Sequence, residues 1–250
     1  MNETISAGDR PQKQTSQIPV ETVELSTGPE PGNCVIWLHG LGADGHDFEP
    51  VVPMLGMEQI AATRFIFPHA PVRPVTLNGG MMMRAWYDIR GMNVGRDQDE
   101  EGIEQSAGLV RALIEREIGR GIPASRIVLA GFSQGGAIAA HVALRYPHKL
   151  AGLMVLSAYL LFPDRLATQL NPANSDTPVF VAHGSMDPMV PFNMGKDLAA
   201  RLRALQLPLE WHEYPMPHSV VQEELHDIGV WLRACLPKTM SAESHQSGKL

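Results

Sequence analysis

The segment that most constrains the fold is residues 126–136, where a strand pattern changes to a helix pattern around one serine. Residues 127–130 are apolar, a Gly-Phe-Ser-Gln-Gly motif follows, and an alanine-rich helical pattern starts directly after it. Gly-x-Ser-x-Gly also arises by chance in loops, but between a strand and a helix it is typical of a tight turn that exposes the hydroxyl. Side chains at Gly131 and Gly135 would collide with the flanking elements. The pattern therefore predicts that Ser133 is a nucleophile.

Six short apolar runs bounded by glycine or proline alternate with longer segments of helical spacing. Such runs suit strands that are buried on both faces, and their alternation with helices predicts βαβ units. The expected fold class is α/β, with a mainly parallel central sheet flanked by helices. The expected strands are residues 34–38, 64–67, 126–130, 152–157, 178–182 and 209–214, and the clearest helices are residues 103–118, 193–205 and 219–235.

Capping and charge patterns refine these boundaries. Acidic residues at positions 97–101 suit the positive end of a helix dipole, so we interpret them as a solvated first turn and not as a binding patch. Ser219 followed by Gln222 is a capping-box pattern, which predicts that the last helix begins at Ser219. We expect one domain at residues 19–237 of the 250, between a disordered leader at 1–18 and a disordered tail at 238–250.

The charge balance argues against several classes of function. With 20 basic and 27 acidic residues the formal charge is −7, which disfavours nucleic acid and anionic membranes as partners. No apolar run approaches the ~20 residues of a membrane span, and the N-terminus lacks the apolar core of a secretory signal. We therefore expect a cytoplasmic protein without stable membrane insertion. Cys34 and Cys235 are expected to be reduced thiols, and no Cys and His pair has metal-ligand spacing.

Three candidate catalytic side chains each follow a predicted strand. They are Ser133, Asp187 and His218, in that chain order. Because the carboxyl ends of parallel strands share one edge of a sheet, we expect the three side chains to converge there. His218 would take the proton of the Ser133 hydroxyl and return it to the leaving group, and Asp187 would fix the tautomer of the imidazole.

Other residues compete for two of these roles. His39 and His183 also stand at predicted strand ends, but the expected chain order places the base just before the last helix. Asp164 and Asp176 lie in the long loop after residue 157, whereas Asp187 leaves a strand directly. The alternative interpretation of Asp187 is that it only forms a turn with the proline that follows it.

An acyl-transfer site also needs donors for the oxyanion. The residue after the nucleophile, Gln134, is expected to supply one backbone N–H, and a glycine-rich loop after an early strand the other, for which we choose Leu41. That loop could instead bind phosphate, but no Walker lysine is present.

The acyl pocket is less determined by the sequence. Three methionines at positions 81–83, with Trp86 and Tyr87, form an apolar stretch that suits an acyl chain because methionine side chains are adaptable. Ordinary core packing explains the same stretch equally well. We expect Trp86, Met83 and Leu41 to contact the substrate.

Six motifs, including the elbow and the glycine-rich loop, occur in order between about residues 35 and 236. They are His39-Gly40-Leu41-Gly42-Ala43-Asp44-Gly45, Phe67-Pro68-His69-Ala70-Pro71, Arg84-Ala85-Trp86-Tyr87-Asp88-Ile89, Gly131-Phe132-Ser133-Gln134-Gly135-Gly136, Ala182-His183-Gly184-Ser185-Met186-Asp187 and Tyr214-Pro215-Met216-Pro217-His218-Ser219. Together they resemble the phospholipase/carboxylesterase family, which includes bacterial carboxylesterases and acyl-protein thioesterases. The resemblance implies an α/β-hydrolase fold with little or no cap domain, the same triad and oxyanion donors, and no metal or organic cofactor.

The resulting expectation is a serine carboxylesterase that works through an acyl-enzyme intermediate on a small ester or thioester. Within the family, Met83-Arg84-Ala85-Trp86 is more similar to bacterial carboxylesterases than to eukaryotic thioesterases. An acyl-protein thioesterase or a lysophospholipase with the same triad is the alternative, and a non-catalytic binding module on the same fold is a more distant one. Met and Leu residues near the site would suit a homodimer, but nothing in the sequence fixes the oligomeric state.

Overall fold

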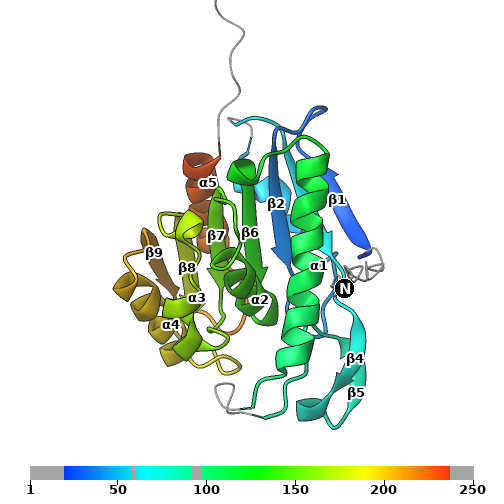
Figure 1. Cartoon of the computed structure of the whole chain (residues 1–250), viewed down its shortest axis with the longest axis vertical. Helices are drawn as coiled ribbons and strands as arrows, with labels where there is room; N and C mark the ends of the chain where they lie inside the picture. Colours follow the sequence, from blue (N-terminus) through cyan, green and yellow to red (C-terminus); the bar gives the residue numbers. More distant parts are fainter. Residues whose placement is uncertain (1–19, 58–59, 92–96, 237–250) are drawn as a thin grey trace, which may run out of the picture.

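The central sheet is built from seven strands in the part of the chain that the computed structural model describes, residues 20–57, 60–91 and 97–236 (Figure 1). The strands are β1 (Thr22–Ser26), β2 (Asn33–Leu38), β3 (Thr63–Pro68), β6 (Ile127–Phe132), β7 (Gly152–Leu156), β8 (Val179–Gly184) and β9 (Leu209–Tyr214). Their order is β1-β3-β2-β6-β7-β8-β9, and β1 at one edge runs antiparallel to β3 while the other neighbours are parallel. The predicted α/β class with a mainly parallel sheet is confirmed.

Helices cover both faces of this sheet, and alternate side chains of each strand pack against them. Cys34 and Ile36 share one core with helices α1 (Glu100–Gly119) and α2 (Gln134–Ala143), whereas Val35 and Trp37 share the other with α5 (Gln222–Cys235). Figure 1 shows α1 and α2 in front of the sheet and α5 behind it. The other helical segments are η1 (Glu49–Leu55), η2 (Thr76–Asn78), η3 (Ala124–Arg126), η4 (Pro163–Arg165), α3 (Leu166–Gln169), η5 (Pro172–Asn174) and α4 (Phe192–Ala204).

Each of the six strands expected from the sequence is present, with bounds that differ by at most two residues. Strand β1 was not expected, because it is a short edge strand with mixed polar and apolar residues and no fully buried face. A separate two-stranded hairpin, β4 (Val72–Val75) and β5 (Met81–Arg84), was also not expected. It stands apart from the main sheet in Figure 1 and carries the three methionines. The two expected disordered termini lie outside the described residues.

Helix α1 begins at an aspartate with more than one partner. Asp99 is the N-cap, and its side chain accepts the backbone N–H of Gly102 at 3.2 Å. The same carboxylate accepts the backbone N–H of Asp88 at 2.9 Å and a guanidinium N–H of Arg90 at 3.1 Å. The acidic run is therefore a first turn, as expected, but Asp99 within it is buried and ties residues 88–90 to the helix.

The last helix begins later than the capping-box pattern predicted. Helix α5 starts at Gln222 with Val221 as its N-cap, and Val221 makes no side-chain capping bond. The backbone N–H of Ser219 donates to the Pro217 carbonyl at 2.9 Å, in the turn that carries His218. The prediction of a helix start at Ser219 is wrong because this turn, and not the helix, uses Ser219.

A buried carboxyl group lies in the first turn of α5. Glu224 has no exposed surface, and its burial raises the pKa of the carboxyl group to about 8. The nearby Asp227 carboxylate raises this pKa further, while the Val221 backbone N–H offsets part of the rise. The folded protein therefore keeps a proton on Glu224 that the unfolded chain releases near its ordinary pKa of 4.5.

Between about pH 4.5 and pH 8 the folded state binds more protons at Glu224 than the unfolded state does, so stability falls as the pH rises. We expect Glu224→Gln to remove much of this fall, which is on the order of a few kcal/mol. Urea unfolding at pH 5, 6.5 and 8 measures it. Glu223→Gln, one residue earlier and exposed, is the control and should keep the wild-type slope. If the free energy of unfolding changed equally with pH in wild type and Glu224→Gln, a raised pKa of Glu224 would be contradicted.

Helix α5 packs very closely on η1 through Gly229. A Cβ added there would lie 2.1 Å from the carbonyl oxygen of Leu55. That carbonyl already accepts a hydrogen bond from Arg233 at 2.8 Å. Since the contact is to backbone, no side-chain rotation relieves it, and the glycine sets the distance between the last helix and η1.

We expect Gly229→Ala to lower the free energy of unfolding by about 1–3 kcal/mol, even though alanine is the better helix former. Gly119→Ala, in α1, is the matched control, because a Cβ there meets nothing within 4 Å. It should leave stability unchanged or raise it by up to ~1 kcal/mol. Denaturant unfolding of both variants is the measurement, and equal effects would show that the Leu55 contact imposes no constraint.

Candidate active site

Ser133 sits in the turn between β6 and α2 in a backbone conformation that serine rarely adopts. Its φ is 54° and its ψ is −121°. Its backbone N–H donates to the Leu156 carbonyl at 2.8 Å, and its own carbonyl accepts the N–H of Ala137 at 3.1 Å. The neighbouring strand and the first turn of α2 thus hold the strained residue in place.

Two glycines allow this turn because three backbone segments cross at it. A Cβ on Gly131 would lie 2.4 Å from the carbonyl carbon and oxygen of Gly135. A Cβ on Gly135 would lie 2.5 Å from the carbonyl oxygens of Leu38 and His39, at the end of β2. The collisions expected from the sequence are therefore present, and they involve β2 as well as β6 and α2.

The imidazole of His218 lies between Ser133 and Asp187. His218 Nε2 is 2.9 Å from Ser133 Oγ, and His218 Nδ1 is 2.6 Å from Asp187 Oδ2. The carboxylate oxygen can only accept, so Nδ1 carries the proton and Nε2 is left to accept the serine hydroxyl. The Phe132 ring packs against the imidazole with the ring centroids 4.6 Å apart. This arrangement is able to activate a serine hydroxyl for attack on an acyl carbon.

The second carboxylate oxygen of Asp187 is held by backbone. Oδ1 accepts the N–H groups of Met189 and Val190 at 2.8 and 2.9 Å. The carbonyl of Val190 in turn accepts Nε2–H of His183 at 2.9 Å. Burial lowers the pKa of His183, so this histidine stays neutral, and its hydrogen bond to Val190 stabilises the loop after β8.

The competing acids lie elsewhere. Asp164 is exposed and 3.8 Å from Arg201, and Asp176 pairs with Lys149 on the surface. Neither has a contact with His218 among the described residues. The position of Asp187 beside the imidazole agrees with the preference given to it from its place after a strand.

Leu41 and Gln134 both line the cavity beside Ser133. Leu41 follows β2, Gln134 opens α2, and among the described residues neither backbone N–H has a hydrogen-bond acceptor. The loop after β2 turns at Gly42, whose φ of 78° favours glycine and whose N–H donates to the Arg84 carbonyl at 2.9 Å. Two free amide donors and a helix N-terminus next to a serine hydroxyl can stabilise negative charge that develops on a substrate oxygen.

A cavity of about 520 Å³ opens beside Ser133 and His218. Its size is in the range of small-molecule sites, and its wall is largely apolar. Side chains from the hairpin, the segment after it, the elbow, the loop after β8 and the first turn of α4 supply that wall, mainly Leu77, Met83, Ile89, Phe132, Met189 and Met194.

The outcome for the expected substrate-contacting residues is mixed. Met83 and Leu41 line the cavity, and their contact with substrate stays a prediction. Trp86 does not: it is fully buried, and its indole N–H donates to the His39 carbonyl at 2.9 Å. The expectation that Trp86 contacts substrate is wrong because its side chain is part of the hydrophobic core. Sequence analysis missed Tyr159, although it follows β7 closely and the strand-end argument could have included it.

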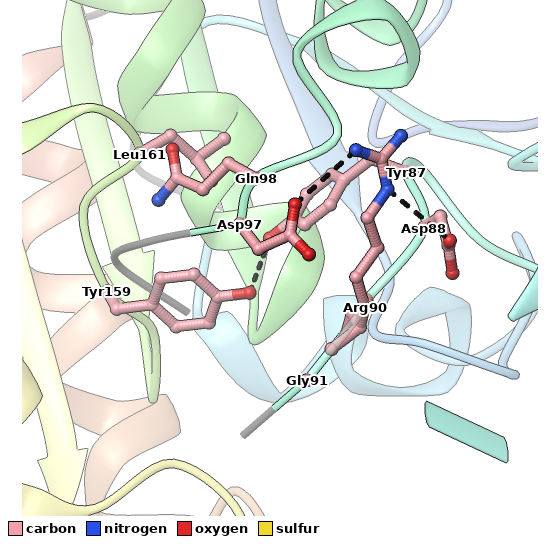
Figure 2. Close-up of a pocket in the computed structure, with 9 residues that line it drawn as sticks. Tyr87, Asp88, Arg90, Gly91, Asp97, Gln98, Tyr159 and Leu161 are labelled. Carbon is pink, nitrogen blue, oxygen red and sulfur yellow. Dashed lines mark hydrogen bonds and ion pairs between the residues drawn. The ribbon is translucent and has the colours of Figure 1, made fainter. Parts of the chain in front are cut away.

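A second hollow of about 10 Å³ adjoins the main cavity, and its lining includes Tyr87 and Tyr159, whose hydroxyl groups are buried (Figure 2). These hydroxyls are 2.6 Å apart, and burial raises the pKa of Tyr159 to about 12, so both remain protonated. Figure 2 also shows Arg90 between Asp88 and Asp97, at 3.8 and 3.6 Å. The hollow holds no more than about one water molecule, so it is no substrate site.

Other features of the described residues bear on cofactors and membranes. Residues 20–57, 60–91 and 97–236 contain no group of three or more His, Cys, Asp or Glu side chains arranged to hold a metal ion. None of the helices in those residues combines the length and apolarity that spanning a membrane requires. Cys34 and Cys235 are free thiols, as expected.

Comparisons with known proteins agree with this geometry. The sequence profile of the family described as Phospholipase/Carboxylesterase matches residues 21–236. Acyl-protein thioesterase 1 of Gibberella zeae is 41% identical over 212 residues, which cover 81% of this chain and 90% of that protein. Acyl-protein thioesterase 1 of Yarrowia lipolytica is 41% identical over 204 residues, which cover 79% and 89%. The crystal structure of Arabidopsis thaliana SOBER1 matches with a TM-score of 0.76 at 32% identity, covering 81% of this chain and 98% of that one.

Since the family profile and the curated relatives both span most of the chain, the protein belongs to the phospholipase/carboxylesterase family of serine hydrolases.

Proposed function

We propose that this protein hydrolyses acyl thioesters, and that carboxylic esters are further substrates of the same site. The observation that carries the proposal is the hydrogen-bonded chain from Ser133 Oγ through His218 to Asp187 at the wall of the apolar cavity. The preference for thioesters rests on the two acyl-protein thioesterases with 41% identity. We thus place the thioesterase above the simple carboxylesterase that the sequence favoured.

The proposed reaction starts with attack of Ser133 Oγ on the acyl carbon while His218 Nε2 takes the hydroxyl proton. Collapse of the tetrahedral intermediate breaks the C–S bond, and the sulfur leaves as a thiol with the proton from His218. Water then attacks the acyl-enzyme with His218 again as base, the bond from the acyl carbon to Ser133 Oγ breaks, and Oγ takes the proton from His218 as the carboxylic acid is released. Asp187 accepts Nδ1–H throughout, so it holds the ring orientation and stabilises the imidazolium.

The oxyanion of both tetrahedral intermediates would accept hydrogen bonds from the backbone N–H groups of Leu41 and Gln134. Their lack of other acceptors supports this role, because such donors need not break a bond when the charge forms. Removal of one donor of this kind typically lowers the rate about 10²- to 10³-fold.

The cavity is the proposed site for the acyl chain. Its apolar wall includes Met83, Phe132 and Met194, and methionine side chains adapt to flexible chains. Each methylene buried there contributes about 0.8 kcal/mol, or nearly fourfold in binding. A lysophospholipid would present the same acyl chain on an oxygen ester, so it is the nearest alternative substrate. On the sequence argument given above we retain the cytoplasm as the expected location.

Ser133→Ala should lower kcat by at least about 10⁴-fold on an acyl thioester and on an aryl ester alike, because it removes the nucleophile. Stopped-assay hydrolysis and labelling by a fluorophosphonate measure this, with the unfolding midpoint as a check on the fold. Asp187→Asn should cost roughly tenfold to a hundredfold less, because Asp187 forms no bond to the substrate. Wild-type turnover by Ser133→Ala would refute the assignment, and a wild-type protein that resists labelling would favour a non-catalytic binding module.

The acyl preference is tested with paired thioesters and oxygen esters of two to sixteen carbons. We expect kcat/KM to rise about fourfold per methylene until the cavity is filled, and the thioester to exceed the ester at each length. Met83→Ala should flatten the rise at long chains. Met82→Ala, next to it on the hairpin and exposed, should not. A flat profile, or lysophospholipid turnover above that of the thioesters, would contradict the proposed substrate class.

A further inference from the structure

Trp86 lies behind the active site and uses all of its hydrogen-bonding groups. It is fully buried, and it does not line the cavity. Its indole N–H donates to the His39 carbonyl at 2.9 Å, and its backbone N–H donates to Gln134 Oε1 at 2.8 Å. Its carbonyl accepts the hydroxyl proton of Ser106, on α1. One residue thus contacts α1, the start of α2 and the end of β2.

The bond to His39 bears on the amide of Leu41. His39 Nδ1 donates to the carbonyl of Gly40 at 2.7 Å. That carbonyl and the Leu41 N–H belong to one planar trans peptide, so they point in opposite directions. The His39 ring therefore fixes the direction of the Leu41 N–H, and Trp86 holds His39 through its carbonyl and through ring contact at a centroid distance of 5.3 Å.

His39 can do this because it is neutral and in one tautomer. Burial lowers its pKa to about 4. Nε2 accepts the backbone N–H of Ala70 at 3.0 Å, so the single ring proton is on Nδ1. The competing histidine of the sequence analysis is thus a fixed donor to Gly40 and not a base.

The backbone N–H of Trp86 contacts the other donor residue, Gln134. The Gln134 side chain is buried and bonded at both ends, because Oε1 accepts Trp86 N–H and Nε2 donates to the Tyr87 carbonyl at 2.7 Å. These bonds tie the first residue of α2 to the bend at residues 86–87. The position of the Gln134 backbone N–H, next to Ser133, is thereby coupled to the same segment that holds His39.

We propose that Trp86 is a positioning residue that holds both oxyanion donors. It holds Leu41 through His39, and it holds Gln134 through the bond from the Trp86 backbone N–H to the Gln134 side chain. This role rests on the proposed function and deepens it. Because Trp86 does not touch the cavity, its bonds affect the transition state, where the oxyanion forms, more than the binding of the ground state.

The test is Trp86→Phe with Trp37→Phe as the matched control. Trp37 is also a buried tryptophan, but its indole N–H has no hydrogen-bond partner among the described residues. The two substitutions remove similar volume, and only Trp86→Phe removes a bond. We expect kcat to fall about tenfold to a hundredfold for Trp86→Phe with KM within twofold, and kcat to stay within threefold for Trp37→Phe.

A trifluoromethyl ketone with a medium acyl chain supplies the second readout, because it forms a tetrahedral oxyanion adduct with an active serine. Its affinity, measured by calorimetry, should weaken for Trp86→Phe by the same factor as kcat/KM, whereas a merely structural role would alter the unfolding midpoint without this match. Equal effects of the two substitutions, or an unchanged ketone affinity for Trp86→Phe, would overturn the proposal.

Gln134→Met is the second variant, and it keeps the backbone N–H while it removes both side-chain bonds. It should also lower kcat and the ketone affinity together, so the proposal can be refuted even where Trp86→Phe folds poorly. The proposed function fails in a different way, by absence of wild-type turnover or by turnover of Ser133→Ala, and the calorimetric readout needs no turnover.

Discussion

The crossing of three backbone segments at the elbow is the constraint on which the site depends. Gly131 and Gly135 bring β6, the start of α2 and the end of β2 into contact through main-chain atoms, so no side-chain movement can change their spacing. Ser133 accepts a conformation that costs on the order of 1–3 kcal/mol because these segments over-determine it. The hydroxyl therefore stands clear of the chain, the helix N-terminus lies beside it, and the loop after β2 comes within reach.

Around the elbow, the polar groups are fixed before any substrate arrives. Both oxygens of Asp187 have partners, one of them the imidazole of His218. His39 is kept neutral by burial and is bonded at both ring nitrogens. A site of this kind does not need to reorganise its dipoles when charge develops, and such preorganisation is usually the largest single contribution to catalysis. The side chains that face the cavity are mostly apolar.

The sequence predicted the parts of the protein that follow strict spacing. Five of the six predicted strands are buried and mainly apolar. Ser133, Asp187 and His218 each follow a predicted strand, and they meet because the carboxyl ends of parallel strands share one edge of the sheet. Strand β1 and the hairpin β4–β5 were missed because these short strands have no fully buried face that would impose a period on the sequence. The burial of Trp86 could not be predicted, since an apolar residue after a loop fits a cavity wall and a core equally well. The capping-box pattern at Ser219 failed because the backbone of Ser219 forms the turn that carries His218 and does not begin the helix.

The hairpin has a consequence of its own. It forms a sheet separate from the seven main strands, yet it supplies Met83 to the cavity. Part of the wall that would contact the substrate, including Leu77 and Met83, thus lies outside the main sheet, whereas the proposed catalytic residues follow strands of that sheet. Substitutions at Leu77 or Met83 would reshape this part of the wall, whereas changes at Arg84 would also reach the loop after β2, because the Arg84 carbonyl accepts the N–H of Gly42. Homologous proteins with the same main sheet can therefore differ in substrate preference while they keep the same catalytic reaction.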